Sequence, residues 1–261
     1  MICIWCKRDG VPISVEHIIP ESLGCPEAFV FSKGEVCQKC NNKLGNVDQA
    51  LLHEFEVMSF WNGIPRKRGK TPKIDSFPGL RAEVIDGEKT FYLNMEKYPV
   101  APHAGLKVPP RNANVRALDG SMQQIGDTAK IEFSFQIGKH KKFNRALHKV
   151  AFTSTAYFLG VSAIEGQEYD HIREYVLHGG KSRPVIMLRP EQHEYHHEIF
   201  PPLKSEVTGL YIVRMVLCGL TFIVDLSPNL AALFELESSL KRDSQYNGWW
   251  SMIPPNRATC E

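Results

Sequence analysis

The sequence predicts an α+β protein that has a small zinc-clamped module at its N-terminus and a larger mixed α+β domain after it. Two Cys-x-x-Cys pairs, Cys3 with Cys6 and Cys37 with Cys40, enclose a short strand pattern, and a helical pattern follows them. Farther along, strand pairs joined by Asp-Gly turns occur together with amphipathic helices. We therefore expect three parts: the module at 1–62, a basic linker at 63–78 and the C-terminal domain at 79–261.

The composition is that of a soluble globular protein and sets limits on its class. The chain has 261 residues, with 43% hydrophobic and 23% charged residues, which is enough for one large domain or two modest ones. It contains neither a long apolar run nor a secretory leader pattern, so we expect no membrane span and a cytoplasmic location. The formal charge of +2 does not by itself indicate a polyanionic partner.

In the N-terminal module we expect a strand at 15–19, because Val15, Ile18 and Ile19 have high strand propensity and Pro20 ends the run. Residues 20–34 are rich in proline and glycine and predict an irregular loop. Gly45 should end a short helical turn. A helix should then cover 47–61, where apolar residues recur at a helical period.

The C-terminal part combines strand and helix patterns. We expect strands at 81–85, 90–94, 115–118, 122–125, 130–137, 184–188, 209–217 and 220–226, the last two forming a buried hairpin around Cys218 and Gly219. Helices are expected at 143–160, 169–177 and 229–241. The tail after 241 should be irregular.

The four paired cysteines predict a structural zinc site. Cys-x-x-Cys spacing places two sulfurs on one knuckle, and two such knuckles supply the four thiolates of a tetrahedral site. Such a site has no open position for water, so it supports the fold and does not carry a reaction. The three other cysteines are scattered, and this usage fits a reducing compartment better than a disulfide framework.

Glu16, His17 and Asn41 are the candidate reaction groups. A histidine suits the role of general base because its pKa lies near neutral pH. A carboxylate beside an amide oxygen is a ligand set suited to Mg²⁺. A lone histidine on a strand is more often a packing or surface residue, and neighbouring strand residues point to opposite faces. The position of His17 between two zinc knuckles makes a catalytic role the stronger interpretation.

These residues resemble the HNH nucleases, which have the ββα-metal fold. The resemblance rests on Glu16-His17-Ile18-Ile19-Pro20 and on Cys37-x-x-Cys40-Asn41-Asn42, and it covers about residues 3–50. It implies that His17 deprotonates the attacking water. It also implies that Glu16 and Asn41 hold one divalent ion, Mg²⁺ or Mn²⁺, at the scissile phosphate of DNA. Hydrolysis of this kind typically leaves 5′-phosphate and 3′-hydroxyl ends.

The chain departs from the family pattern at two places. The family's middle asparagine, which braces the loop, would fall near Ser32 or Lys33, and neither is asparagine. Asn42 or Asp48 would be the alternative braces. The acid before the histidine is Glu16, where many members have aspartate.

Two basic clusters are candidates for contact with the DNA backbone. One consists of Arg66, Lys67, Arg68, Lys70 and Lys73; the other, at 139–149, includes Lys141, Lys142 and Lys149 and has no acid. Such residues neutralise phosphates without sequence preference, and a solvated face is the alternative for each. His193, His196 and His197 resemble a metal site, but a surface loop is the favoured interpretation because no acid or cysteine knuckle matches them.

The sequence therefore predicts an HNH endonuclease that cuts DNA, with a C-terminal domain for target recognition, sensing or oligomerisation. By analogy alone, this layout suits a restriction or phage-defence nuclease. A single site cuts one strand, so a homodimer or repeated nicking would be needed for double-strand breaks. Two alternatives stay open: a zinc-containing nucleic-acid-binding module without catalysis, and an effector that is gated by a ligand of the C-terminal domain.

Overall fold

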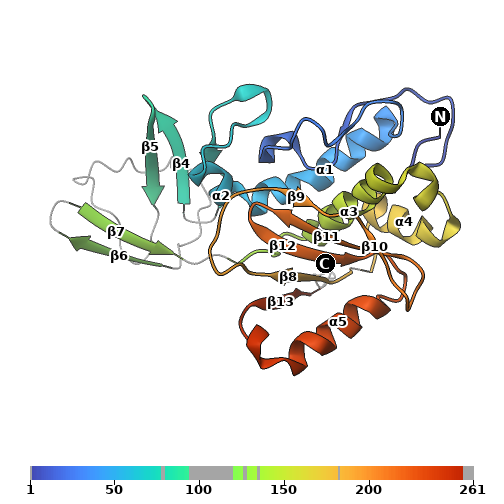
Figure 1. The fold of residues 1–261 in the computed structure, drawn as a ribbon. Coiled ribbons are helices and arrows are strands. Elements are labelled where there is room, and N and C mark those ends of the chain that lie inside the picture. Colours follow the sequence, from blue (N-terminus) through green and yellow to red (C-terminus); the bar gives the residue numbers. More distant parts are fainter. Residues whose placement is uncertain are drawn as a thin grey trace. The chain divides into compact units, whose positions relative to one another are not determined.

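The computed structural model describes residues 2–77, 80–93, 120–125, 128–133, 136–181 and 183–254. The chain divides into two compact units, one made of 1–54 together with 138–261 and the other of 55–137. This division differs from the expected order of module, linker and domain, because the described residues up to 54 and those from 138 to 254 belong to the same unit. The expected strand at 115–118 lies outside the described residues. The α+β class is confirmed (Figure 1).

The N-terminal part of the first unit contains β1 (Glu16–His17), β2 (Val30–Phe31) and α1 (Gln38–Glu54). β1 pairs antiparallel with β2, with Glu16 opposite Phe31 and His17 opposite Val30. The loop expected at 20–34 therefore contains a strand as well as the 3₁₀ turn η1 (Glu21–Leu23).

The helix prediction for this part was wrong at Gly45, which lies inside α1. A glycine within a helix costs about 1 kcal/mol relative to alanine. Leu44 and Val47 on either side of Gly45 are buried, and their packing offsets that cost. The helix expected at 47–61 is divided between α1 and α2 (Glu56–Trp61), which belongs to the second unit.

The helix expected at 143–160 is confirmed as α3 (Phe143–Leu159). It contacts α1, α4 (Asp170–His178) and two strands of the main sheet. From Phe143 to Ala156 every residue except Arg145 is buried. A helix that is buried on all sides lies at the centre of its domain, so α3 is the core around which the first unit packs.

The main sheet has six antiparallel strands. Its order is β10 (Leu203–Lys204), β11 (Tyr211–Leu217), β12 (Leu220–Asp225), β8 (Val185–Leu188) and β13 (Trp250–Ile253), with β9 (Glu198–Ile199) paired to β11. The predicted β11–β12 hairpin is confirmed, and Cys218 and Gly219 form its turn with φ values of 52° and 80°. β13 lies in the tail that was expected to be irregular.

Two helices cover opposite faces of this sheet (Figure 1). The Phe222 ring on β12 packs edge-on against Phe143 of α3, with centroids 5.8 Å apart. The next residue, Ile223, packs in the cluster formed by Leu230, Leu233 and α5 (Ala231–Arg242). Adjacent strand residues point to opposite faces, so α3 and α5 bury one face each.

The second unit contains α2, β3 (Lys73–Ile74), β4 (Leu80–Ile85), β5 (Glu88–Leu93), β6 (Gly120–Ile125) and β7 (Thr128–Phe133). β3, β4 and β5 form one antiparallel sheet, and β6 pairs with β7. Phe60, Ile74 and Leu80 belong to its core. Further 3₁₀ turns in the chain lie at Lys67–Gly69, Val161–Ile164, Gln167–Tyr169 and Ser244–Tyr246. No helix among the described residues is long and apolar enough to cross a membrane.

Candidate functional site

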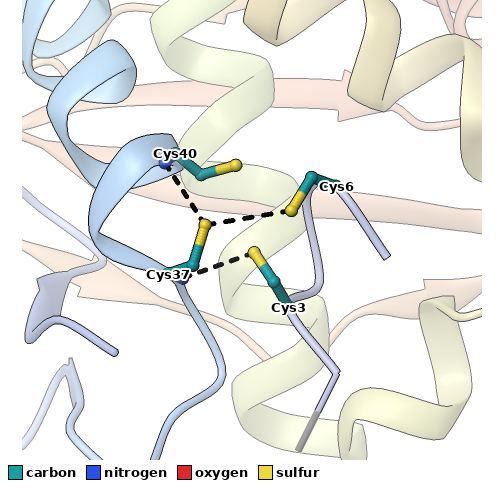
Figure 2. Close-up of side chains that lie close together, drawn as sticks. All are labelled: Cys3, Cys6, Cys37 and Cys40. Carbon is teal, nitrogen blue, oxygen red and sulfur yellow. Dashed lines mark hydrogen bonds between the residues drawn. The ribbon is translucent and has the colours of Figure 1, made fainter. Parts of the chain in front are cut away.

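The four paired cysteines converge on one point (Figure 2). The sulfur atoms of Cys3, Cys6, Cys37 and Cys40 all lie within 4.8 Å of one another. The Cys37 backbone N–H donates to Cys3 Sγ at 3.4 Å, and the Cys40 N–H donates to Cys37 Sγ at 3.4 Å. The first pair comes from the N-terminal turn, and the second lies at the start of α1. The predicted convergence of the two knuckles is confirmed.

The thiols of this cluster shift one another's pKa values: the hydrogen bond to Cys3 and burial raise the pKa of Cys40, and burial raises that of Cys37. A hydrogen bond from the Cys40 thiol, with further bonds from backbone N–H groups, outweighs burial and lowers the pKa of Cys3 to about 4. Thiolates are the form of cysteine that binds zinc. With four sulfur donors and no carboxylate or imidazole in the group, the cluster can hold a structural zinc ion.

The first knuckle is attached to the helical core of the first unit. The Trp5 ring packs on Phe152 of α3 with centroids 4.8 Å apart. Arg173 of α4 lies over the same Phe152 ring and donates from Nε to the Ile4 carbonyl at 2.7 Å. A zinc ion at the cysteines would therefore be supported by both helices.

Glu16 and His17 form β1 and have different surroundings. The Glu16 side chain is buried, with 1% of the residue exposed, and forms an ion pair with Lys149 of α3. His17 is half-buried. The two side chains were expected to point to opposite faces of the strand, and their burial agrees: Glu16 faces the core while His17 keeps access to solvent.

Asn41 joins the start of α1 to the residues just before β1. Its side-chain nitrogen donates to Ser14 Oγ at 2.7 Å and to the Val15 carbonyl at 2.6 Å. The Ser14 N–H also donates to the Val36 carbonyl at 3.0 Å. Both Asn41 bonds use the amide nitrogen, so the amide oxygen is the atom that suits a hard metal ion.

Lys149 belongs to this site. It was expected in a DNA-facing basic cluster, and that expectation was wrong. The residue is 0% exposed. Its ammonium group pairs with Glu16 Oε1 and with Asp48 Oδ1, the latter at 3.2 Å. It also donates to the His17 carbonyl at 2.7 Å. A signal for this was present in the sequence, because Lys149 lies among the apolar residues of a helix that carries few charges.

The charged groups of this cluster shift the pKa values of Lys149 and Asp48. Burial lowers the pKa of Lys149, but the Asp48 and Glu16 carboxylates outweigh burial and raise it overall. Burial raises the pKa of Asp48 to about 6, against the opposing effect of Lys149. The cluster therefore places one ammonium group between the carboxyl groups of Glu16 and Asp48.

The candidates for the family's loop brace occupy different places. Ser32 and Asn42 are exposed. The Lys33 backbone N–H donates to Glu35 Oε2 at 2.8 Å. Of these four residues, Asp48 is the one that pairs with Lys149, which in turn pairs with Glu16 on β1.

The first basic cluster lies in the second unit. Arg66 pairs with the buried Glu56 at 3.4 Å and with Asp75 at 3.2 Å, and Lys73 also pairs with Asp75. Lys67, Arg68 and Lys70 are exposed in the turn between them.

The second basic cluster and the histidine group lie in the first unit. Lys141 is exposed and Lys142 is half-buried, just before α3. His193 Nε2 bonds to the Cys218 carbonyl at 2.7 Å, and His197 Nε2 bonds to the Leu23 carbonyl at 2.5 Å. Apart from the four cysteines, no group of His, Cys, Asp or Glu in the described part of the chain brings three ligand atoms together.

Comparison with known proteins adds one match. Residues 3–56 match a family model described as HNH endonuclease. No curated protein and no solved structure matches the chain significantly. The matched segment begins at Cys3, contains β1 and β2, and extends past the end of α1. The N-terminal part of this chain is therefore an HNH endonuclease domain.

Proposed function

We propose that this protein is a metal-dependent endonuclease that hydrolyses phosphodiester bonds in DNA. The observation that supports the proposal most directly is the link between β1 and α1. Asn41 holds the residues just before His17 through two hydrogen bonds, and the four-cysteine cluster lies at the start of the same helix. This arrangement ties the segment that leads into the half-buried His17 to the helix that carries Asn41, within the residues that match the HNH family.

In this proposal the two metal sites have different roles. Zinc at the four cysteines would hold the N-terminal knuckle against α1. Mg²⁺ or Mn²⁺ would be held by the Glu16 carboxylate and the Asn41 amide oxygen, both hard oxygen donors of the kind these ions prefer. When bound, such an ion stabilises the negative charge on the scissile phosphate and on the leaving oxygen.

His17 would be the general base. A neutral imidazole can accept a proton from the attacking water near pH 7. The backbone around His17 is fixed on two sides, by pairing with Val30 on β2 and by the bond from Lys149 to the His17 carbonyl. A fixed base loses little entropy when the water is positioned.

DNA would be bound through its phosphates. The candidates for these contacts are Lys141 and Lys142 in the first unit and Arg66, Lys67, Arg68, Lys70 and Lys73 in the second. Such contacts give affinity that depends on salt concentration but not on sequence. A restriction or phage-defence role, action as a homodimer and a cytoplasmic location are compatible with this proposal.

Cleavage of supercoiled plasmid tests the proposal. The wild-type protein, loaded with zinc, should nick the plasmid when Mg²⁺ or Mn²⁺ is added and should be inactive in EDTA. His17→Ala should lower the rate at least 100-fold, which is the lower range for loss of a general base. His196→Ala is the matched control, because His196 is exposed and its imidazole bonds to the nearby Glu194 carbonyl at 3.0 Å.

Two results would contradict the proposal in different ways. Equal nicking by the wild type and His17→Ala would remove His17 from the mechanism. Salt-dependent DNA binding without any metal-dependent product would instead favour the non-catalytic binding module.

A ligand-gated nuclease is a second candidate, and one observation favours it. A cavity of about 770 Å³ lies among α4, α5, β13 and the segment between α4 and β8, and Arg183 and Met252 are in its wall. Arg183 donates from Nε to His148 Nε2 at 3.3 Å, and His148 precedes Lys149 on α3. A change in nicking rate on filling the cavity with Met252→Trp, at unchanged melting temperature, would support gating, and an unchanged rate would contradict it.

A further inference from the structure

We infer that Lys149 is a positioning residue of the nuclease site, supplied by the C-terminal half of the chain. The inference rests on the proposed function, because it concerns how Glu16 and His17 are held for that reaction. Lys149 lies on α3, far from the HNH segment in sequence, and its ammonium group reaches both residues of β1. The family match ends at residue 56, so the matched segment does not include Lys149.

The ammonium group is surrounded by oxygen atoms. It pairs with Glu16 Oε1, contacts Asp48 Oδ1 at 3.2 Å and Oδ2 at 3.3 Å, and donates to the His17 carbonyl at 2.7 Å. The Ile18 carbonyl lies 3.4 Å away. Lys149 therefore connects the proposed metal ligand, the backbone of the proposed base and an acid from α1.

A purely structural role explains this arrangement poorly. Burying a lysine carries a large desolvation cost, and an apolar replacement of a whole buried ion pair is often as stable. The neighbours of Lys149 on α3 are buried, and they include apolar residues such as Leu147 and Val150 as well as the polar Thr153. A charge is useful here because it fixes carboxylate and carbonyl oxygens in direction as well as in distance.

The consequence for the site concerns the orientation of Glu16. Lys149 holds Oε1, which leaves Oε2 as the oxygen that would reach a divalent ion. Partners that orient a ligating carboxylate typically contribute 10- to 100-fold to metal affinity. Without Lys149, Glu16 and Asp48 would repel each other and the Glu16 side chain would lose its fixed direction.

Calorimetric titration of the zinc-loaded, full-length protein with Mn²⁺ tests the inference, alongside plasmid nicking. Lys149→Met should bind Mn²⁺ at least 10-fold more weakly than the wild type while keeping its zinc. Lys149→Arg should restore part of the affinity, because it keeps the positive charge. Lys241→Met is the matched control: Lys241 is also a helical lysine in an ion pair, with Glu237 at 2.7 Å, but it is exposed.

Lys149→Met leaves the buried Glu16 and the partly buried Asp48 carboxylates without their cation and can lower the folded fraction. In that case the variant to titrate is Lys149→Met combined with Asp48→Asn, which removes one charge of each sign, compared with Asp48→Asn alone. The double variant should bind Mn²⁺ at least 10-fold more weakly than the single one. Zinc content and the melting temperature show whether each protein is folded.

The outcomes separate the inference from the proposed function. Equal Mn²⁺ affinity in wild type and Lys149→Met would overturn the inference. Tighter binding would also overturn it, because the ammonium would then compete with the metal for Glu16. A wild type that binds no Mn²⁺ leaves no ion for Lys149 to position and overturns it as well. Mn²⁺ binding without cleavage would overturn the proposed function alone, and the inference would still be decided by the binding ratio.

Discussion

The Lys149 ammonium group donates to the His17 carbonyl at 2.7 Å, across 132 residues of chain. This bond joins the central helix of the C-terminal half to the strand that carries the candidate base. The HNH segment is therefore part of a larger unit and shares its core, as the packing of Trp5 on Phe152 also shows. Substitutions in α3 should consequently affect the nuclease site through this packing, without altering a contact to DNA.

Loss of one of the four clustered cysteines should release the zinc ion and destabilise the segment that it holds. We expect Cys37→Ser to lower the zinc content from about one per chain to near zero, and to lower stability by several kcal/mol, because metal binding in such sites contributes directly to folding. Zinc can be measured by atomic emission and stability by thermal unfolding. Cys25→Ser is the control: Cys25 is outside the cluster, and zinc loss in this variant too would show that the cysteine effect is not specific.

Asn41→Ala should affect both stability and cleavage. It removes two hydrogen bonds, to Ser14 and Val15, and each typically contributes about 1 kcal/mol. We expect a loss of about 2 kcal/mol in urea unfolding, and a fall in nicking of at least 100-fold because the amide oxygen is lost with the nitrogen. Asn46→Ala, an exposed position on the same helix, should change neither. A variant at Asn41 that unfolds more easily but nicks normally would remove Asn41 from the reaction.

His148 should make the protein less stable in mild acid. Burial and the Arg183 guanidinium lower the pKa of His148 to about 3, and its ring bonds to the Asn144 carbonyl at 2.7 Å. The unfolded chain binds this proton below about pH 6.5 whereas the folded chain does not, so stability falls as the pH drops from 6.5 towards 3. Between pH 7 and pH 5 the expected loss from this residue is about 2 kcal/mol.

Urea unfolding of the wild type and His148→Gln at pH 7 and pH 5 measures this effect. The difference between the two proteins cancels contributions from zinc release and from other acids. The wild type should lose about 2 kcal/mol more than the variant, since glutamine does not titrate. Parallel losses in the two proteins would mean that His148 is not kept neutral by its surroundings.

Lys141 and Lys142 should set part of the salt dependence of DNA binding. Each phosphate contact contributes about 0.9 to the slope of log K against log salt concentration. Replacing both by alanine should reduce the slope by about 2, measured by fluorescence anisotropy on a DNA duplex over a range of NaCl concentrations. Lys204→Ala on the exposed strand β10 is the control. An unchanged slope in the double variant would mean that these two lysines are only a solvated face.

Some parts of the fold follow from local sequence. Cys-x-x-Cys spacing places two sulfurs on the same side of a turn, so the cluster was predictable from the two pairs alone. The β11–β12 hairpin was equally predictable, because two apolar runs meet at Cys218-Gly219, where Gly219 accepts a positive φ at little cost. Helix α3 was also predictable from local sequence, because the apolar residues after Phe143 recur at a helical period.

Other elements were decided by their partners. β2 and β13 are short strands whose own sequences give weak signals, and they exist because β1 and β8 offer paired edges. Gly45 stays helical because the buried residues beside it pack against the rest of the unit. In each case the local preference is worth about 1 kcal/mol or less, and packing outweighs it.

The site shows the same division. The candidate chemistry can be predicted from residue type and spacing, because the cysteine knuckles, Glu16-His17 and Asn41 are recognisable motifs. The burial of Glu16 and its pairing with Lys149 are visible in the folded chain alone, since in the sequence Lys149 is one more basic residue of a cluster. Helical periodicity shows which face of α3 is apolar but not what surrounds the other faces. Burial of a charge depends on those surroundings, and they come from segments distant in the chain.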